Sequence, residues 1–145
     1  MKVVVISGFF NPLHGGHLDM IEAAAQLGTK LIVVVNNDIQ QVFKKDKVIL
    51  SEQNRARLIG ALRGVDEVLI AVDDDPTVIQ TLEIIAQKHP NDELIFANGG
   101  DRDSEKAIPE TEVCRRYNIK TVFGVGGMNK ADSSTRINQA LGHKK

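Results

Sequence analysis

The chain has 145 residues and a mass of 15.9 kDa, with 42% hydrophobic residues and 18 lysines and arginines against 19 aspartates and glutamates. This length predicts one compact domain, residues 1–145, large enough to fold without a disulfide or a structural metal. The net charge of -1 argues against a duplex-binding module, which carries a basic excess. No apolar run approaches the roughly 20 residues that span a bilayer.

The cysteine content and the start of the chain bear on its compartment. Cys114 is the only cysteine and cannot form an internal disulfide, which favours a reducing environment. No signal-peptide pattern precedes the first strand-like run. We therefore expect a cytoplasmic protein with neither a nucleic acid nor a membrane as its partner.

Short runs rich in valine, isoleucine and leucine predict five strands. Each run is continuously apolar rather than alternating, which is typical of parallel strands covered by helices on both faces. The predicted strands are Lys2–Ser7, Leu31–Val35, Glu67–Val72, Glu93–Ala97 and Lys120–Val125.

Segments with helical spacing lie between and after these strands. The predicted helices are Leu18–Leu27 with Gly28 as its C′ residue, Ser51 to about Leu62, one that starts at Pro76, Pro109–Tyr117 and Ser133–Leu141. Alternation of this kind predicts an α/β fold, a single Rossmann-like, doubly wound, five-stranded parallel sheet with helices on both faces. Ligands of such sheets bind at the carboxyl ends of the strands.

The turn after the first strand carries the strongest chemical signal. Residues 8–17 read GFFNPLHGGH and open the first helix, where backbone N–H groups and the positive helix end can meet a phosphate. Neither a GxGxxG fingerprint nor a P-loop lysine occurs there. His14 and His17, three residues apart, can reach one ligand and donate hydrogen bonds to phosphate oxygens.

Two other interpretations of the histidine pair remain open at this point. The rings can be a helix-capping pair satisfied by the backbone. A zinc site is less favoured, because it needs another protein ligand and His89 and His143 lie in unrelated segments. The acidic run Asp73–Asp75 before Pro76 is likewise interpreted as a capped helix start rather than a metal site.

Residues 10–17, FNPLHGGH, resemble the F-(D/N)-P-x-H-x-G-H signature of the HxGH nucleotidyltransferase superfamily, also called cytidylyltransferase-like. Its members transfer a nucleoside monophosphate from a nucleoside triphosphate to a phosphorylated acceptor and release pyrophosphate. The resemblance implies catalytic roles for His14 and His17. It also implies nucleotide contacts for Gly8, Phe9, Phe10 and Gly16, and an acceptor contact for Asn11.

Two positions in this turn depart from the commoner family pattern. Phe9 stands where many members have threonine or a small residue, so a side-chain phosphate contact is lost there. Asn11 replaces the commoner aspartate. Although Phe9 and Phe10 belong to the implied nucleotide site, their rings are expected in the core rather than stacked on a base.

Further resemblance is to glycerol-3-phosphate cytidylyltransferases and to the adenylyltransferase domain that activates heptose 1-phosphate. In those enzymes a lysine and an arginine after the second strand contact the phosphates, which implies catalytic roles for Lys44 and Arg55. Lys45 and Lys47 are alternatives to Lys44, because the stretch is expected to be a flexible loop. Asp38 in the same stretch is assigned to the acceptor.

Two later segments extend the implied site. Residues 98–102, NGGDR, are similar to the GGDY segment of these enzymes, and residues 133–137, SSTRI, to the family's S-(S/T)-T-x-I segment. Their implied roles are nucleotide binding by Gly99, Ser133, Ser134, Thr135 and Arg136, and acceptor binding by Gly100 and Asp101. Hydroxyls and N–H groups at a helix start suit a β- or γ-phosphate.

The expected reaction is transfer of a nucleoside monophosphate to a small phosphorylated acceptor, such as a sugar or polyol phosphate. Met128 stands where glycerol-3-phosphate cytidylyltransferases have an arginine, and Lys130 and Arg136 are the alternatives for its role. The heptose-type adenylyltransferases also lack that arginine and have the more similar Gly-Gly-Asp, so the resemblance favours ATP over CTP. Mg²⁺ is expected to be carried on the triphosphate, with no metal site of the protein's own. Relatives of this size are commonly homodimers. The alternatives are a glycerol-3-phosphate-type cytidylyltransferase and a non-catalytic nucleotide-sensing module.

Overall fold

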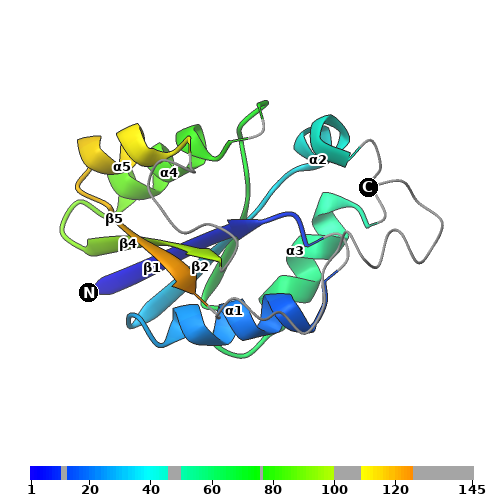
Figure 1. The fold of residues 1–145 in the computed structure, drawn as a ribbon, viewed down its shortest axis with the longest axis horizontal. Coiled ribbons are helices and arrows are strands. Elements are labelled where there is room, and N and C mark those ends of the chain that lie inside the picture. Colours follow the sequence, from blue (N-terminus) through cyan, green and yellow to red (C-terminus); the bar gives the residue numbers. More distant parts are fainter. Residues whose placement is uncertain (11–12, 46–49, 76, 100–108, 126–145) are drawn as a thin grey trace.

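A computed structural model describes residues 1–10, 13–45, 50–75, 77–99 and 109–125. Within these residues the strands are β1 (Lys2–Gly8), β2 (Lys30–Val35), β3 (Glu67–Ile70), β4 (Glu93–Gly99) and β5 (Lys120–Val125). They form one five-stranded sheet in the order β3-β2-β1-β4-β5, and every neighbouring pair is parallel (Figure 1). The predicted α/β fold is confirmed.

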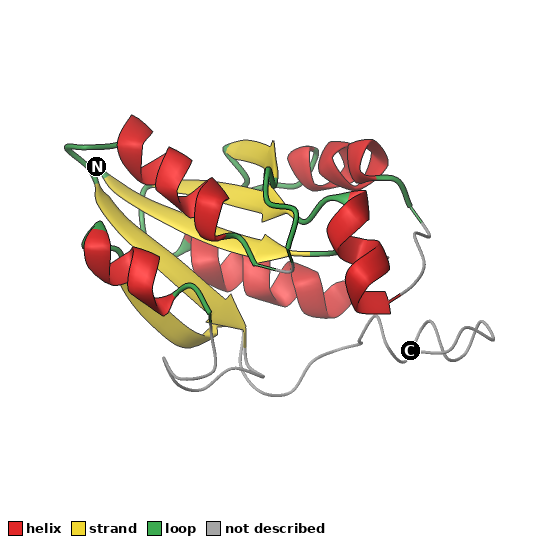
Figure 2. Ribbon diagram, turned by 90° about the horizontal axis from the view of Figure 1, so that it is seen from above, coloured by secondary structure: helices red, strands yellow, loops and turns green. Residues whose placement is uncertain are grey.

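Helices cover both faces of this sheet (Figure 2). The described helices are α1 (Gly15–Ala25), α2 (Asp38–Lys45), α3 (Glu52–Gly60), α4 (Ile79–Lys88) and α5 (Thr111–Arg116). Helices α1 and α3 pack on one face, and α4 and α5 on the other, while α2 lies beyond the carboxyl end of β2 (Figure 1). None of the described helices is long and apolar enough to cross a membrane.

Successive residues of each central strand enter different cores. In β1, Val4 and Ile6 pack in the core under α1 and α3, whereas Val3 and Val5 pack in the core under α4 and α5. All four side chains are at most 1% exposed. Because both faces are covered, the strand has no solvent-facing side, and its sequence is continuously apolar.

The strand order reverses at β1, which has β2 on one side and β4 on the other. At such a switch point the connections leave the sheet in opposite directions, so a crevice opens at the carboxyl edge. The histidine-bearing turn follows β1 and Gly99 ends β4, so the topology brings both to the carboxyl edge of the sheet.

The acidic run after β3 caps helix α4. The Asp73 carboxylate, 1% exposed, accepts hydrogen bonds from Gln80 N (2.8 Å), Thr81 N (3.2 Å) and Thr81 Oγ1 (2.5 Å). Asp75 accepts from the hydroxyl and the backbone N–H of Thr77, and these bonds lower the pKa of the Asp75 carboxyl. The cap interpretation is confirmed, but the helix begins at Ile79 rather than at Pro76, because the Asp73 cap fixes its start.

Helix α2 corrects the prediction of a loop around the lysines. It extends through Lys44 and ends at Lys45, while Lys47 lies outside the described residues. Its polarity is inverted, since Ile39 and Val42 are 61% and 50% exposed whereas Gln40 and its neighbour Gln41 are buried. Ile39 and Val42 have the spacing of an apolar helix face, but this face is exposed and the amide face is buried. The usual rule that the apolar stripe of a helix faces the core therefore fails for α2.

Other boundaries shift by a few residues. Helix α1 starts at Gly15, three residues before the predicted Leu18, because His14 caps it. Strand β3 ends at Ile70 rather than Val72, and α3 and α5 are shorter than predicted. Ser51 caps α3 as predicted, accepting from Asn54 N at 3.3 Å. The predicted last helix, 133–141, lies outside the described residues.

Gly28 is not the C′ residue of α1 that the sequence predicts. The C-cap of α1 is Gln26, and Gly28 does not have a left-handed backbone. A Cβ on Gly28 would lie 2.6 Å from the Lys2 carbonyl oxygen and 2.8 Å from a Val4 methyl group. The residue is therefore glycine because the chain passes close to the backbone of β1.

We expect Gly28→Ala to lower the free energy of unfolding by about 1–3 kcal/mol, as forced overpacking does. Gly60→Ala is the matched control, because a Cβ there would lie 3.6 Å from Val68, an ordinary contact, at the end of a helix. Urea unfolding of both variants checks this. Equal stabilities of the Gly28 variant and the wild type would contradict the packing argument.

Candidate nucleotide and phosphate site

The histidine pair forms the start of helix α1. His14 is the N-cap, and its Nδ1 accepts a hydrogen bond from Gly16 N at 3.1 Å. His17 Nδ1 accepts from the backbone N–H of His14 at 3.3 Å, so the two side chains form a reciprocal capping box. The two imidazole rings are stacked, with centroids 3.8 Å apart and an interplanar angle of 24°.

This capping geometry also decides which ring nitrogens carry protons. A nitrogen that accepts a backbone N–H must have a free lone pair, so a neutral ring is protonated at Nε2. In each neutral imidazole the proton is therefore on Nε2, while Nδ1 holds the helix start. The capping role and the predicted phosphate role are compatible, because they use different nitrogens of the same ring.

Phe10 supports His17 from the core. Its ring is 2% exposed and meets the His17 ring edge to face at 4.8 Å, with an interplanar angle of 69°. It also packs over Gly8, where a Cβ would lie 2.8 Å from the Phe10 ring. The ring is in the core, as expected, so a nucleotide contact by Phe10 stays a prediction for its backbone.

The backbone of Phe10 has a positive φ of 52°. This left-handed conformation costs a residue with a Cβ about 1–2 kcal/mol. Burial of a whole aromatic ring offsets that cost. The strained residue lies between β1 and the histidines, which is where the chain must turn sharply to start α1.

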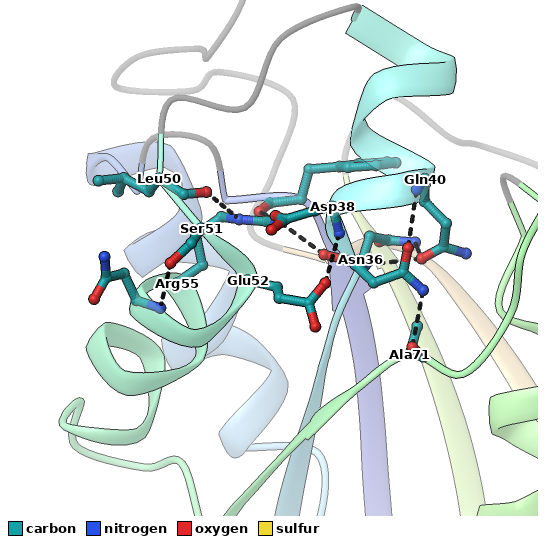
Figure 3. A network of polar contacts seen from close by, with 11 residues as sticks. Asn36, Asp38, Gln40, Leu50, Ser51, Glu52, Arg55 and Ala71 are labelled. Atoms are coloured by element: carbon teal, nitrogen blue, oxygen red, sulfur yellow. Dashed lines mark hydrogen bonds and ion pairs between the residues drawn. The ribbon is translucent and has the colours of Figure 1, made fainter.

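Arg55 lies in the interior, with its side chain fully buried. Its Nε donates to Leu50 O (2.9 Å), one terminal nitrogen to both Phe9 O and Asn36 O (2.7 Å each), and the other to Asp38 Oδ1 (2.6 Å) (Figure 3). The predicted contact of Arg55 with substrate phosphates stays a prediction. The structure shows a buried arginine that donates hydrogen bonds to three backbone carbonyls and to the carboxylate of Asp38.

Asp38 has a similar place in this network. One of its carboxylate oxygens accepts from Arg55, and its backbone N–H donates to Glu52 Oε1 at 2.9 Å (Figure 3). The Asp38 side chain remains 34% exposed. Its predicted contact with the acceptor stays a prediction, now from a side chain whose orientation Arg55 sets.

A second polar cluster holds the other flank of α2. Gln40 Oε1 accepts from Asn36 Nδ2 and Asn37 N, and Gln40 Nε2 donates to the carbonyls of Asp75 and Thr77 at 2.7 Å. Asn37 Nδ2 donates to the carbonyls of Ala71 and Asp73. These amides connect the end of β2 to the loop after β3.

The sequence places Asn36 and Asn37 in the stretch after the second strand, but sequence reasoning assigned no role to them, to Gln40 or to Glu52. A usable signal existed for the asparagines, because two polar residues directly follow a buried strand at the carboxyl edge of the sheet. Gln40 and Glu52 gave no such signal, since their roles depend on partners that are distant in sequence.

The remaining predicted residues divide in two. Gly8 ends β1, Gly16 is buried in the first turn of α1, Gly99 ends β4 and Lys44 lies on α2. The predictions outside the described residues concern Asn11, Gly100, Asp101, Ser133, Ser134, Thr135 and Arg136.

A comparison with family models decides the family. The model of the cytidylyltransferase-like family matches residues 5–145. The chain belongs to this family. The match includes the capped histidine turn and all of the sheet after the first residues of β1.

Two relatives illustrate the similarity. The chain is 32% identical over 138 residues to the bifunctional protein HldE of Gluconobacter oxydans, covering 94% of this chain and 26% of that protein. It is 33% identical over 123 residues to the D-beta-D-heptose 1-phosphate adenylyltransferase of Bordetella bronchiseptica, covering 83% of this chain and 70% of that one. The chain thus spans about a quarter of the length of the bifunctional relative.

Solved structures with the same fold include two microbial proteins. A lipopolysaccharide core biosynthesis protein from Thermoplasma volcanium superimposes with a TM-score of 0.67 and 25% identity, over 91% of this chain and 99% of that one. A putative nicotinate-nucleotide adenylyltransferase from Vibrio parahaemolyticus superimposes with a TM-score of 0.66 and 18% identity, over 97% and 86% of the chains. The latter similarity concerns the fold alone.

Proposed function

We propose that this cytidylyltransferase-like chain transfers a nucleoside monophosphate from a nucleoside triphosphate to a small phosphorylated acceptor and releases pyrophosphate. The observation that carries the proposal is the stacked pair of His14 and His17, with both Nδ1 atoms held by the backbone. This fixes two N–H donors at a helix N-terminus beside the switch point of the sheet, a place suited to polyphosphate.

In the proposed reaction an oxygen of the acceptor phosphate attacks the α-phosphorus in line. A bond forms between that oxygen and the α-phosphorus, the bond to the bridging oxygen of the β-phosphate breaks, and pyrophosphate leaves with the electron pair. A phosphate oxygen is already ionised, so the step needs no general base. The contributions of the protein are positioning and charge stabilisation, by His14 and His17 at the α- and β-phosphates.

The chemistry of the relatives favours ATP and a sugar phosphate. A similar protein is named a heptose 1-phosphate adenylyltransferase, and Met128 replaces the arginine expected of glycerol-3-phosphate cytidylyltransferases. Predicted acceptor contacts are those of Asn11, Asp38, Gly100 and Asp101. CTP with a polyol phosphate is the alternative pair of substrates, and a nucleotide sensor without turnover is the alternative function.

Mg²⁺ belongs to the proposal as an ion carried on the triphosphate, where it would neutralise phosphate charge. Among the described residues, no group of three or more His, Cys, Asp or Glu side chains could hold a metal. Mg²⁺ usually keeps several waters and binds through the phosphates of a substrate. A homodimer in the cytoplasm also stays a prediction, and sedimentation of the purified protein tests the dimer.

A pyrophosphate-release screen tests the proposed function. The four common nucleoside triphosphates are each combined with sugar 1-phosphates, including heptose 1-phosphate, and with polyol phosphates. We expect release with ATP and a sugar 1-phosphate. Binding of a triphosphate by calorimetry, without release for any acceptor in the panel, would favour the sensor.

Lys44 lies on α2, and we predict that it, or one of the alternatives Lys45 and Lys47, neutralises the triphosphate. Alanine replacement of the acting lysine should raise the KM for the triphosphate and lower kcat, since a cation on phosphate is a strong electrostatic contribution. Lys88 ends α4 shortly before β4 begins, at the amino edge of the sheet and away from the predicted site, and provides the control. Unchanged kinetics in all three single variants would refute a role for this lysine group.

A further inference from the structure

Arg55 is the buried junction of four chain segments that meet under the predicted site. Its guanidinium bonds to the turn after β1 through Phe9, to the end of β2 through Asn36, to the start of α2 through Asp38, and to Leu50 before its own helix (Figure 3). The side chain is 0% exposed.

We propose that Arg55 is a positioning residue that holds the histidine turn and helix α2 in register, rather than a ligand of the substrate phosphates. The inference rests on the proposed function, because it assigns a task within that reaction. It departs from the family resemblance, which implies that Arg55 contacts phosphate.

The hydrogen-bonding capacity of the guanidinium supports this assignment. Arginine has five N–H donors, and four of those of Arg55 are directed at protein acceptors within 2.6–2.9 Å. A bidentate phosphate contact needs two N–H groups on one edge of the fork. Arg55 has at most one N–H left, so such a contact would break bonds that hold the chain and would require the buried group to move.

The path from Arg55 to the histidines is short. The Phe9 carbonyl that accepts from Arg55 belongs to the peptide that leads into Phe10, the residue with φ of 52°. The ring of Phe10 lies edge to face against His17. Arg55 thus fixes the peptide that precedes the strained residue Phe10. Without the Arg55 side chain this turn is expected to relax, which would displace His17.

The path from Arg55 to the other side of the site runs through Asp38. The ion pair at 2.6 Å and the bond from Asp38 N to Glu52 both tie the first turn of α2 to α3. Gln40 and Asn37 hold the opposite flank. The first turn of α2 is therefore fixed on both flanks by hydrogen bonds. The guanidinium of Arg55 bonds both to this first turn and to the turn that bears the histidines.

The ion pair also explains why an arginine is tolerated in the interior. A buried guanidinium without a carboxylate partner is strongly destabilising, whereas Asp38 supplies the compensating charge. Arg55 and Asp38 should consequently act as one unit. Changing either residue should therefore lower kcat by the same route, and changing both should not add a second loss.

The experiment is a double-mutant cycle on kcat with Arg55→Lys, Asp38→Asn and the double variant. Arg57→Ala is the control, because Arg57 is an exposed arginine on the same helix. Lysine keeps the positive charge but cannot reproduce the fork, so positioning predicts that Arg55→Lys lowers kcat about 10- to 100-fold. The Kd of the triphosphate, measured by calorimetry, should change less than about threefold.

We expect Asp38→Asn to lower kcat as well. The kcat of the double variant should be no lower than that of the less active single variant. Asp38→Asn is nearly isosteric, so it informs on the cycle even where Arg55→Lys fails to fold in a thermal melt. Additive losses, or a loss in Arg55→Lys confined to the Kd of the triphosphate, would overturn the inference in favour of a phosphate ligand. Wild-type protein that releases no pyrophosphate would instead contradict the proposed function itself.

Discussion

Replacement of His17 by alanine is expected to reduce turnover roughly 100-fold or more, the scale on which one preorganised donor to a developing charge acts. The reason is geometric. His17 Nδ1 is used by the backbone of His14, and its other nitrogen is the donor that the proposed reaction needs. Steady-state kinetics with the triphosphate and acceptor found in the screen measure this loss.

Two further variants separate chemistry from folding. His17→Asn keeps a side-chain acceptor near the position of Nδ1 and so preserves the cap, yet it lacks the Nε2 donor, and we expect it to be as inactive as the alanine variant. His89→Ala is the control, because His89 follows α4 and pairs with Asp92. Near-normal turnover in His17→Asn would show that His17 serves the helix alone.

Replacement of Phe10 by alanine should lower the free energy of unfolding by about 3–5 kcal/mol, as large-to-small changes of buried aromatic residues do. The ring is 2% exposed, packs over Gly8 and lies against His17. Alanine loses that packing and also keeps the unfavourable left-handed backbone. Chemical denaturation of the purified variant gives the change directly.

Phe123 provides the comparison for this prediction. It is half-buried at the edge of the core on the other face of the sheet, so Phe123→Ala should cost less stability. A loss in Phe10→Ala no larger than that in Phe123→Ala would show that the ring is not a main support of the turn. Turnover measured well below the melting temperature would then tell whether His17 had moved.

The sheet and its covering helices could be predicted from the sequence because their causes are local. A run such as residues 2–7 has no polar side, so it must be buried on both faces, and alternation with helices then requires parallel strands. The histidine turn was also predictable, since it directly follows β1 and begins α1.

Helix α2 and the task of Arg55 could not be predicted in the same way. The polarity of α2 is inverted because its first turn packs against polar groups of α3 and of the loop after β3. In the sequence, Arg55 is an arginine in a predicted helix near a lysine-rich stretch. Only the fold shows that the carbonyl of Phe9, 46 residues earlier, accepts its hydrogen bond. Long-range polar contacts of this kind leave no periodic trace in a sequence.

The most direct measurement follows the α-phosphorus. Wild-type protein is incubated with ATP labelled at the α-phosphate and with heptose 1-phosphate as acceptor, and the products are separated. The proposed function predicts that the label moves to a nucleoside diphosphate sugar, in equal amount to the pyrophosphate released, and that His17→Asn abolishes the transfer. Label that remains in ATP, with this acceptor and with every other acceptor and labelled triphosphate of the screen, would contradict the proposal.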